Sequence, residues 1–205
     1  MIKIIFINKI ILILINYKFN GGIIMKILIN GGHDRTFESG AVNQNTGLRE
    51  ADVAYNVGIL LEKYLNAVGI ETGFIQSDNL YYDHPGLPCV IEEANSGDYD
   101  LFISLHCNAF NNGVAKGTET LVYSFGGESE KLAECIQKQI IDTFHTVDRG
   151  LKERPGLLVL SKTDMPAVLV EMAFIDNEDD EKLLANNQDD FARAIARGVT
   201  DFMNL

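Results

Sequence analysis

Cysteine is scarce in this chain and is not arranged as a framework. The 205 residues contain three cysteines, Cys89, Cys107 and Cys135, which are widely spaced and include no C-x-x-C pair. An odd and scattered set of this kind argues against a disulfide network and against a zinc site built from cysteines. We therefore expect buried free thiols, with the Cys107 side chain packed on the opposite face of its strand from His106.

Positive charge is also in short supply. Lysine and arginine number 17 against 29 acidic residues, which gives a formal net charge of −12. Lys3, Lys9 and Lys18 all lie in residues 1–24, a segment without acidic residues, so the rest of the chain is more acidic still. Such a surface repels nucleic acid and anionic membranes, and we expect neither as a partner.

The chain lacks internal repeats and low-complexity linkers, and its length suits one domain over residues 25–205, expected to be a monomer. Residues 1–24 are a separate apolar extension. Lys9 divides this stretch and no A-x-A-like cleavage site precedes Met25, so it is a poor signal peptide and short for a stable membrane span. The other interpretation is an upstream in-frame extension before a natural start at Met25.

From residue 26 onward, strand and helix patterns alternate at the spacing of βαβ units. This alternation favours an α/β fold in which a twisted, mostly parallel sheet carries helices on both faces. Strands are expected at residues 26–30, 70–75, 100–105, 118–123, 157–160 and 167–170, and helices at 49–67, 89–95, 130–144, 177–184 and 189–202. Residues 146–155 are expected to be a connection, and residues 77–88 a polar, aromatic surface loop that borders the substrate.

Three of the expected strands are each followed by a side chain that can bind a metal or move a proton. His33 follows residues 26–30, His106 follows 100–105 and Glu171 follows 167–170. In an open α/β sheet, ligands collect outside the carboxyl ends of the strands, so these side chains can converge although they are far apart in sequence. The pattern is typical of a zinc hydrolase.

Catalytic zinc commonly takes three protein ligands and leaves a fourth position for water. His33 and His106 would supply two of them, and the glycines before His33 in GGHD let the backbone turn sharply off the strand. A carboxylate at the start of the next helix would be the third, and Glu50 competes with Asp52 for this role. Residues two apart on a helix point about 200° away from each other, so only one can face the site, and Glu50 is the better placed.

Glu171 ends the apolar run AVLVE, which is expected to be a buried central strand. A carboxylate in such a place costs several kcal/mol unless it is paired or solvated. Near a zinc-bound water it would be a general base that passes its proton to a leaving nitrogen. The alternative is a structural ion pair with an arginine.

The motifs around these residues are specific when they are taken together. They are GGHD and SGA within residues 31–41, RE at 49–50, AN at 94–95, SLHCNA at 104–109, KGTET at 116–120, RGLK at 149–152 and MPAVLVEMAFIDN at 165–177. On these motifs, residues 25–205 resemble the zinc-dependent N-acetylmuramoyl-L-alanine amidases, the cell-wall hydrolases of the amidase-3 type. Two positions depart from the family pattern: Ala54 stands where members often have asparagine, and the arginine common before residues 94–95 is missing.

The resemblance implies zinc held by His33, Glu50 and His106, with Glu171 as the catalytic acid/base. It also implies a substrate, peptidoglycan, and a reaction, hydrolysis of the amide between N-acetylmuramic acid and the L-alanine of the stem peptide. The site of action would be the bacterial cell wall. A host autolysin, a spore-related enzyme and a phage lysin would all use this domain.

Two other functions use the same residues or the same fold. A zinc peptidase or carboxypeptidase that cuts within the stem peptide needs the same metal, water and carboxylate base. A wall-binding module could keep the fold without the chemistry. The joint presence of all four proposed site residues argues against the module.

Overall fold

The computed structural model describes residues 25–84, 86–110 and 113–205. Within them, six strands form one sheet in the order β2–β1–β3–β6–β4–β5. The strands are β1 (Lys26–Gly31), β2 (Glu71–Gln76), β3 (Leu101–Asn108), β4 (Thr118–Val122), β5 (Asp148–Glu153) and β6 (Ala167–Phe174). The pairs β1–β2, β1–β3 and β3–β6 are parallel, whereas β4 runs antiparallel to β6 and parallel to β5. The expectation of a mostly parallel sheet is therefore confirmed.

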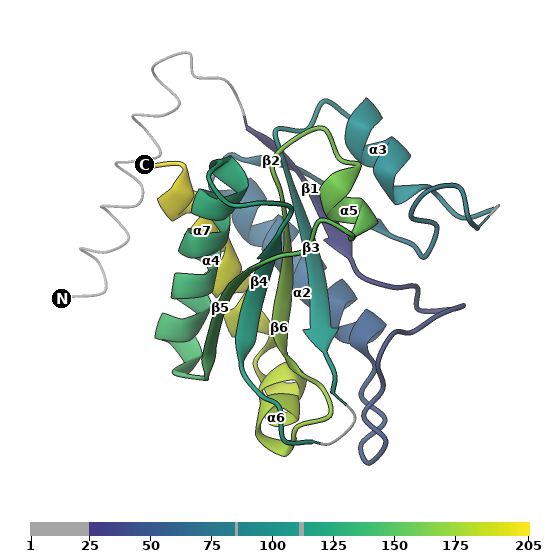
Figure 1. The fold of residues 1–205 in the computed structure, drawn as a ribbon, viewed down its shortest axis with the longest axis vertical. Coiled ribbons are helices and arrows are strands. Elements are labelled where there is room, and N and C mark those ends of the chain that lie inside the picture. The colour runs from purple at the N-terminus through teal and green to yellow at the C-terminus, as the bar shows by residue number, and fades with distance from the viewer. Residues whose placement is uncertain (1–24, 85, 111–112) are drawn as a thin grey trace.

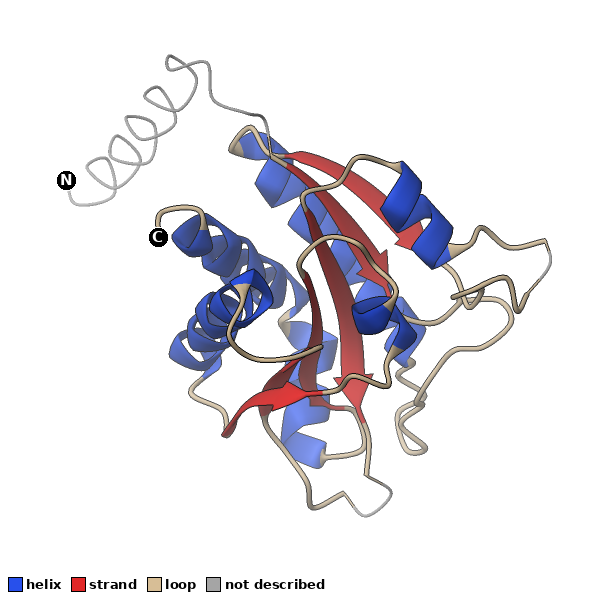
Figure 2. Ribbon diagram, turned by 45° about the horizontal axis from the view of Figure 1, so that its top comes forward, coloured by secondary structure: helices blue, strands red, loops and turns tan. Residues whose placement is uncertain are grey.

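Helices lie on both faces of this sheet, as expected (Figure 1, Figure 2). They are α2 (Glu50–Ala67), α3 (Val90–Ser96), α4 (Glu128–Phe144), α5 (Leu158–Ser161), α6 (Glu178–Asn186) and α7 (Gln188–Phe202). Helices α2, α4, α6 and α7 pack against one face and enclose the larger apolar core, whereas the short helices α3 and α5 cover part of the other. The second face therefore has less helical cover than the first.

Strand β3 shows how the two faces differ. Its residues Ile103, Leu105 and Cys107 are buried in the larger core, whereas Phe102 belongs to the smaller one. Since side chains alternate along a strand, His106 lies on the same face as Phe102. Cys107 is 3% exposed, which confirms that its thiol packs in the core, away from the face of His106.

Two strands are longer than the sequence predicts. Strand β3 continues to Asn108 and β6 to Phe174, so His106 and Glu171 lie within their strands and are paired in register across them. The sequence does not predict these longer strands, because polar residues such as His106 and Glu171 interrupt the apolar runs. The other predicted strands and helices agree with the structure to within two residues, except in one region.

That region is residues 146–160, where the prediction was wrong twice. Residues 148–153, expected to be a connection, form the edge strand β5. Its sequence DRGLKE is charged, as suits an exposed edge, and the left-handed Gly150 interrupts the alternation that would have revealed a strand.

The expected strand at residues 157–160 is instead the short helix α5. A short apolar run fits a buried strand and a buried turn of helix equally well. Val159 and Leu160 of α5 are buried in the smaller core together with Leu169 of β6. The run thus covers the sheet rather than extending it.

The predictions for residues 1–24 lie outside the described residues. Among the helices that the structure describes, none is both long enough and apolar enough to cross a membrane.

Helices α4 and α7 lie side by side against the sheet (Figure 1). A Cβ atom added to Gly198 of α7 would lie 2.5 Å from the Cα of Ile136 in α4 and 2.8 Å from its backbone nitrogen. Two backbones therefore approach each other at a point where no side chain fits.

We expect Gly198→Ala to lower the free energy of unfolding by about 1–2 kcal/mol, because the overpacking cost exceeds the helix propensity that alanine gains. Denaturant unfolding followed by circular dichroism measures this change. Gly156→Ala is the matched control, since a Cβ there meets open space. A Gly198→Ala protein as stable as the parent would contradict the close approach of the helices.

Candidate metal and catalytic site

His33 lies just beyond β1, where the chain turns off the sheet. The N–H of Gly32 still donates to the carbonyl of Leu105 on β3, at 2.9 Å, so the turn begins while the backbone is held against the next strand. His33 itself has φ +64°, a left-handed conformation that is uncommon for a residue other than glycine. This backbone turn directs the imidazole back toward β3.

Glu50 begins α2, and its side chain is 5% exposed. No side chain caps this helix; instead the N–H groups of Glu50 and Ala51 donate to the carbonyls of Ala41 and Ser39, at 2.9 and 3.0 Å. The Glu50 carboxylate accepts in return from the N–H of Ala41 and from that of Cys107 on β3, both at 2.9 Å. These bonds fix the helix start against the preceding loop and the sheet.

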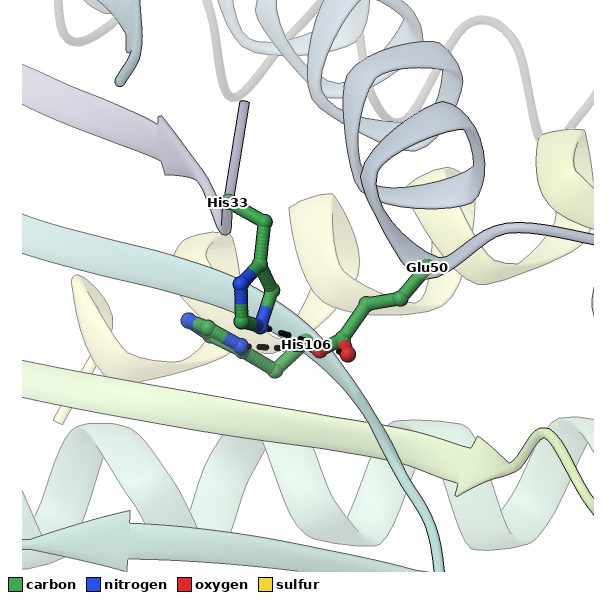
Figure 3. A group of neighbouring side chains, drawn as sticks. All are labelled: His33, Glu50 and His106. Atoms are coloured by element: carbon green, nitrogen blue, oxygen red, sulfur yellow. Dashed lines mark hydrogen bonds and ion pairs between the residues drawn. The ribbon is translucent and has the colours of Figure 1, made fainter. Parts of the chain in front are cut away.

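The carboxylate of Glu50 faces both imidazoles and contacts each of them, as Figure 3 shows. One oxygen, Oε2, is 3.3 Å from Nε2 of His33, and the other, Oε1, is 2.9 Å from Nδ1 of His106. The two rings meet edge to face with centroids 5.1 Å apart. The structure thus brings together the three residues that the sequence predicts as metal ligands.

Asp52, the competing carboxylate, points elsewhere. Its oxygens pair with Arg35 at 2.8 Å and with Arg49 at 3.5 Å. The structure thus places Glu50, and not Asp52, beside the two histidines, and the choice of Glu50 as a metal ligand stays a prediction.

Two glycines make room for the imidazoles. A Cβ on Gly32 would lie 2.4 Å from the His106 ring, and one on Gly40 would lie 2.4 Å from the His33 ring and 2.5 Å from Glu50 Oε2. The GGHD and SGA segments thus contain glycine where a side chain would occupy the space of the site.

The pKa values of Glu50 and His33 are both shifted toward the charged forms of these side chains. Burial by itself raises the pKa of Glu50, but the hydrogen bonds with His106 and His33 outweigh it and hold the pKa far below its usual range. For His33, burial lowers the pKa, and the hydrogen bond and charge of Glu50 reverse this effect, so that the pKa is raised. The carboxylate is consequently ionised and favours a cation beside it.

The other side of the His33 ring faces acidic residues that the sequence analysis did not identify. Its Nδ1 is 3.6 Å from Oε2 of Glu38 and 3.8 Å from Oδ1 of Asp78. Asp78 follows β2, and His84 from the same loop lies 6.3 Å from the ring of Phe37. The loop that contains Asp78 therefore reaches His33, and its position beside the substrate stays a prediction.

Glu171 stands on β6, in register with His106 on β3 and with Glu119 on β4. Its Oε2 is buried and has no hydrogen-bond partner within the described residues. Burial raises the pKa of Glu171 to about 7, with the negative charges of Glu50 and Glu119 adding to the rise and the histidines opposing it. A carboxyl group with such a pKa can both take and give a proton near neutral pH.

The ion pair with arginine, considered as the alternative for Glu171, is made instead by its neighbour Glu119. Oε2 of Glu119 pairs with Arg149 at 2.6 Å and also with Lys152, while Oε1 accepts from Asn108 at 3.2 Å. The sequence analysis missed Glu119, although an acidic residue within the run TETLV is the same signal that identified Glu171.

The donor set of His33, Glu50 and His106 can hold a metal ion. Their ligand atoms all lie within 4.8 Å of one another. Two imidazole nitrogens and a carboxylate oxygen are a common ligand set for a catalytic metal. The ligand roles, and the role of Glu171, stay predictions.

A family model described as N-acetylmuramoyl-L-alanine amidase matches residues 27–201, which include all of these positions. The chain belongs to this amidase family. The resemblance inferred from the motifs is therefore confirmed.

Individual relatives and solved structures agree with this membership. The chain is 33% identical over 180 residues to the N-acetylmuramoyl-L-alanine amidase LytC of Bacillus subtilis, covering 86% of this chain and 35% of LytC. It is 32% identical over 193 residues to the endolysin of Bacillus phage SPP1, covering 87% of this chain and 66% of the endolysin. Among solved structures, the amidase AmiC2 of Nostoc punctiforme matches with a TM-score of 0.77 at 26% identity, over 90% of this chain and 100% of that one. The chain thus spans about a third of the length of LytC.

The ion pairs of Glu119 with Arg149 and Lys152 should stabilise the fold of this amidase domain in a pH-dependent way. Burial raises the pKa of Glu119, but Lys152 and Arg149 outweigh it and hold the pKa below its usual value. A carboxylate whose pKa is lower in the folded state than in the unfolded chain stabilises the fold at pH values above its unfolded pKa, which is roughly 4.3. This stabilisation is lost as the pH falls through the pKa of the folded state. We expect Glu119→Gln to be less stable than the parent at pH 7 and the difference to shrink below about pH 4.

Denaturant unfolding of both proteins at a series of pH values measures this difference. Glu134→Gln, at an exposed position on α4 with no ion pair among the described residues, is the control and should follow the parent at every pH. A stability difference that is independent of pH would contradict the assignment to an ion pair.

Proposed function

We propose that this protein is a zinc-dependent N-acetylmuramoyl-L-alanine amidase that hydrolyses the amide between N-acetylmuramic acid and the L-alanine of the peptidoglycan stem peptide. The observation that carries the proposal is the convergence of His33, Glu50 and His106 beside the buried Glu171 carboxyl, whose Oε2 has no hydrogen-bond partner in the part of the chain that the structure describes. Membership of the amidase family supports the same reaction.

The residues suit zinc in kind. Zinc in catalytic sites is commonly held by imidazole nitrogen and carboxylate oxygen. His33 and His106 would hold it through their imidazole nitrogens and Glu50 through a carboxylate oxygen, and these ligand atoms all lie within 4.8 Å of one another. When bound there, zinc would supply Lewis acidity that makes water nucleophilic near neutral pH and polarises the amide carbonyl.

Glu171 performs the proton transfers in this mechanism. Its carboxylate takes a proton from the attacking water, and the resulting carboxylic acid gives the proton to the nitrogen that leaves with the stem peptide. The buried position that raises its pKa to about 7 keeps both protonation states accessible. Proton transfer of this kind contributes about 10²–10⁴-fold to a rate.

The substrate places the site of action at the bacterial cell wall, and we propose that the protein acts there. The endolysin and LytC that the chain is similar to carry names that fit this location. The expectation of a monomer stays a prediction; the solved structure of the CwlD amidase from Clostridioides difficile is a complex with the GerS lipoprotein.

Loss of one ligand should abolish tight zinc binding. We expect His106→Ala to weaken zinc affinity by more than about 100-fold, because loss of an outer-shell partner alone costs about 10–100-fold. Competition with a fluorescent chelator measures the affinity. Asp52→Asn is the matched control and should bind zinc like the parent, since Asp52 pairs with Arg35 and Arg49 away from the site. Equal affinity of His106→Ala and the parent would remove His106 from the ligand set.

The reaction itself is tested with purified peptidoglycan and the zinc-loaded protein, followed by mass spectrometry of the soluble products. We expect free stem peptides that begin with L-alanine. Glu171→Gln should reduce their release by about 10²–10⁴-fold, because the amide cannot act as a base, while zinc binding stays close to that of the parent.

The products separate the competing functions. Fragments cut within the stem peptide would identify a zinc peptidase and contradict the proposal. Zinc binding without any release, by a protein that still sediments with peptidoglycan, would identify a wall-binding module. Glu178→Gln, at an exposed position on α6, should release stem peptides at the parental rate.

A further inference from the structure

The charged residues of the site form a row that follows the strand order across the sheet. His106 stands on β3, Glu171 on β6 and Glu119 on β4, each in register with the next. Arg149 and Lys152 on the edge strand β5 reach back to Glu119. The two cations therefore lie on the far side of Glu171 from the proposed metal ligands.

This cluster has more positive charge than Glu119 alone requires. Arg149 and Lys152 pair with the same oxygen, and every ion pair that the described residues give them goes to Glu119. Glu119 thus offers one carboxylate to two cations, and Glu171 beside it makes no ion pair with either of them within the described residues, in a chain whose net charge is −12. The Arg149 guanidinium also stacks on Phe174, 4.8 Å from the ring centroid, which leaves the Lys152 ammonium as the freer of the two. The Arg149 and Lys152 side chains are 32% and 28% exposed, so an outside ligand can reach them.

We propose that Arg149 and Lys152 bind a free carboxylate of the stem peptide, and so orient the substrate with its peptide over β4 and β5 and its glycan toward β1. The proposal rests on the proposed amidase function and adds a specificity determinant to it. Near the scissile amide, the glycan side offers hydroxyl and acetamido groups, whereas the peptide side offers carboxylates. The positive charges of Arg149 and Lys152 on one side of the site therefore attract the stem peptide, and not the glycan, to that side.

The distances agree with a carboxylate near the scissile bond. Neighbouring strands are about 4.8 Å apart, so cations held over β4 lie roughly one strand spacing beyond Glu171. An extended peptide advances about 3.3–3.6 Å per residue. The substrate group that would reach these cations is a carboxylate about two residues beyond the scissile amide. The second residue of the stem peptide has such a group when it is joined to the third residue through its side-chain carboxyl, because its α-carboxylate is then free.

The test compares two soluble substrates that differ in one group. One is a muramoyl tripeptide with L-alanine, γ-linked D-glutamate and L-lysine, and the other has the glutamate α-carboxylate converted to an amide. For the full zinc-loaded chain, we expect kcat/KM about tenfold higher for the carboxylate form, mostly through KM, since a charge-assisted hydrogen bond is lost with the amide.

Lys152→Met should remove this preference, so that kcat/KM becomes equal for the carboxylate and amide forms, while Arg149 still pairs with Glu119 and maintains the fold. Lys138→Met, at an exposed position on α4, is the matched control and should keep the preference. Parental enzyme without a preference would overturn the proposal. A Lys152→Met protein with kcat reduced equally on both substrates would overturn it too, because the lysine would then act through Glu171.

Failure of the amidase function is seen separately, as no hydrolysis of either substrate by the parent. Calorimetric binding of the free tripeptide and of its α-amide still tests the inference in that case. We expect the parent to bind the carboxylate form about tenfold more tightly, and Lys152→Met to bind the two forms equally. Equal binding of both peptides by the parent would overturn the proposal.

Discussion

The buried carboxylate of Glu50 is the interaction on which the rest of the site depends. Each of its oxygens accepts one backbone N–H and meets one imidazole: Oε1 contacts Cys107 and His106, and Oε2 contacts Ala41 and His33. An ionised group at 5% exposure would be costly without these partners. The same bonds join the start of α2, the loop before it, β3 and the turn after β1, so the donor set is held in place by the fold.

The contrast between the two faces of the sheet explains why the chemistry collects where it does. The face under α2, α4 and α7 is filled with apolar side chains, whereas the face of Phe102 becomes polar toward the carboxyl ends of β1 and β3. There the buried hydroxyl of Ser104 donates to Asn30 at 2.7 Å, one step before the residues of the site. The short helices α3 and α5 cover only part of this face.

Much of the fold could be predicted because its elements carry strong local signals. The one-sided period of α2 is long enough to identify a helix, and the regular alternation of apolar runs with helical patterns favours strands at β1, β3 and β6. The signal failed at β5, a charged edge strand interrupted by Gly150, and at α5, where four residues are too few to show a period. In both places the packing against the sheet, which is not a local property, decided the structure.

The sequence by itself determined the kinds of side chain at the site and the class of fold. The identity of a histidine, glutamate or glycine does not depend on the fold, and the alternation of strand and helix patterns is a local property of the chain. Only the tertiary structure decided the partners of these side chains. It directed Glu50 to the imidazoles and Asp52 to the arginines, and it paired Arg149 with Glu119 and not with Glu171. The physical reason is that strand order and register place residues side by side that are far apart in sequence, and no local pattern encodes which strands become neighbours.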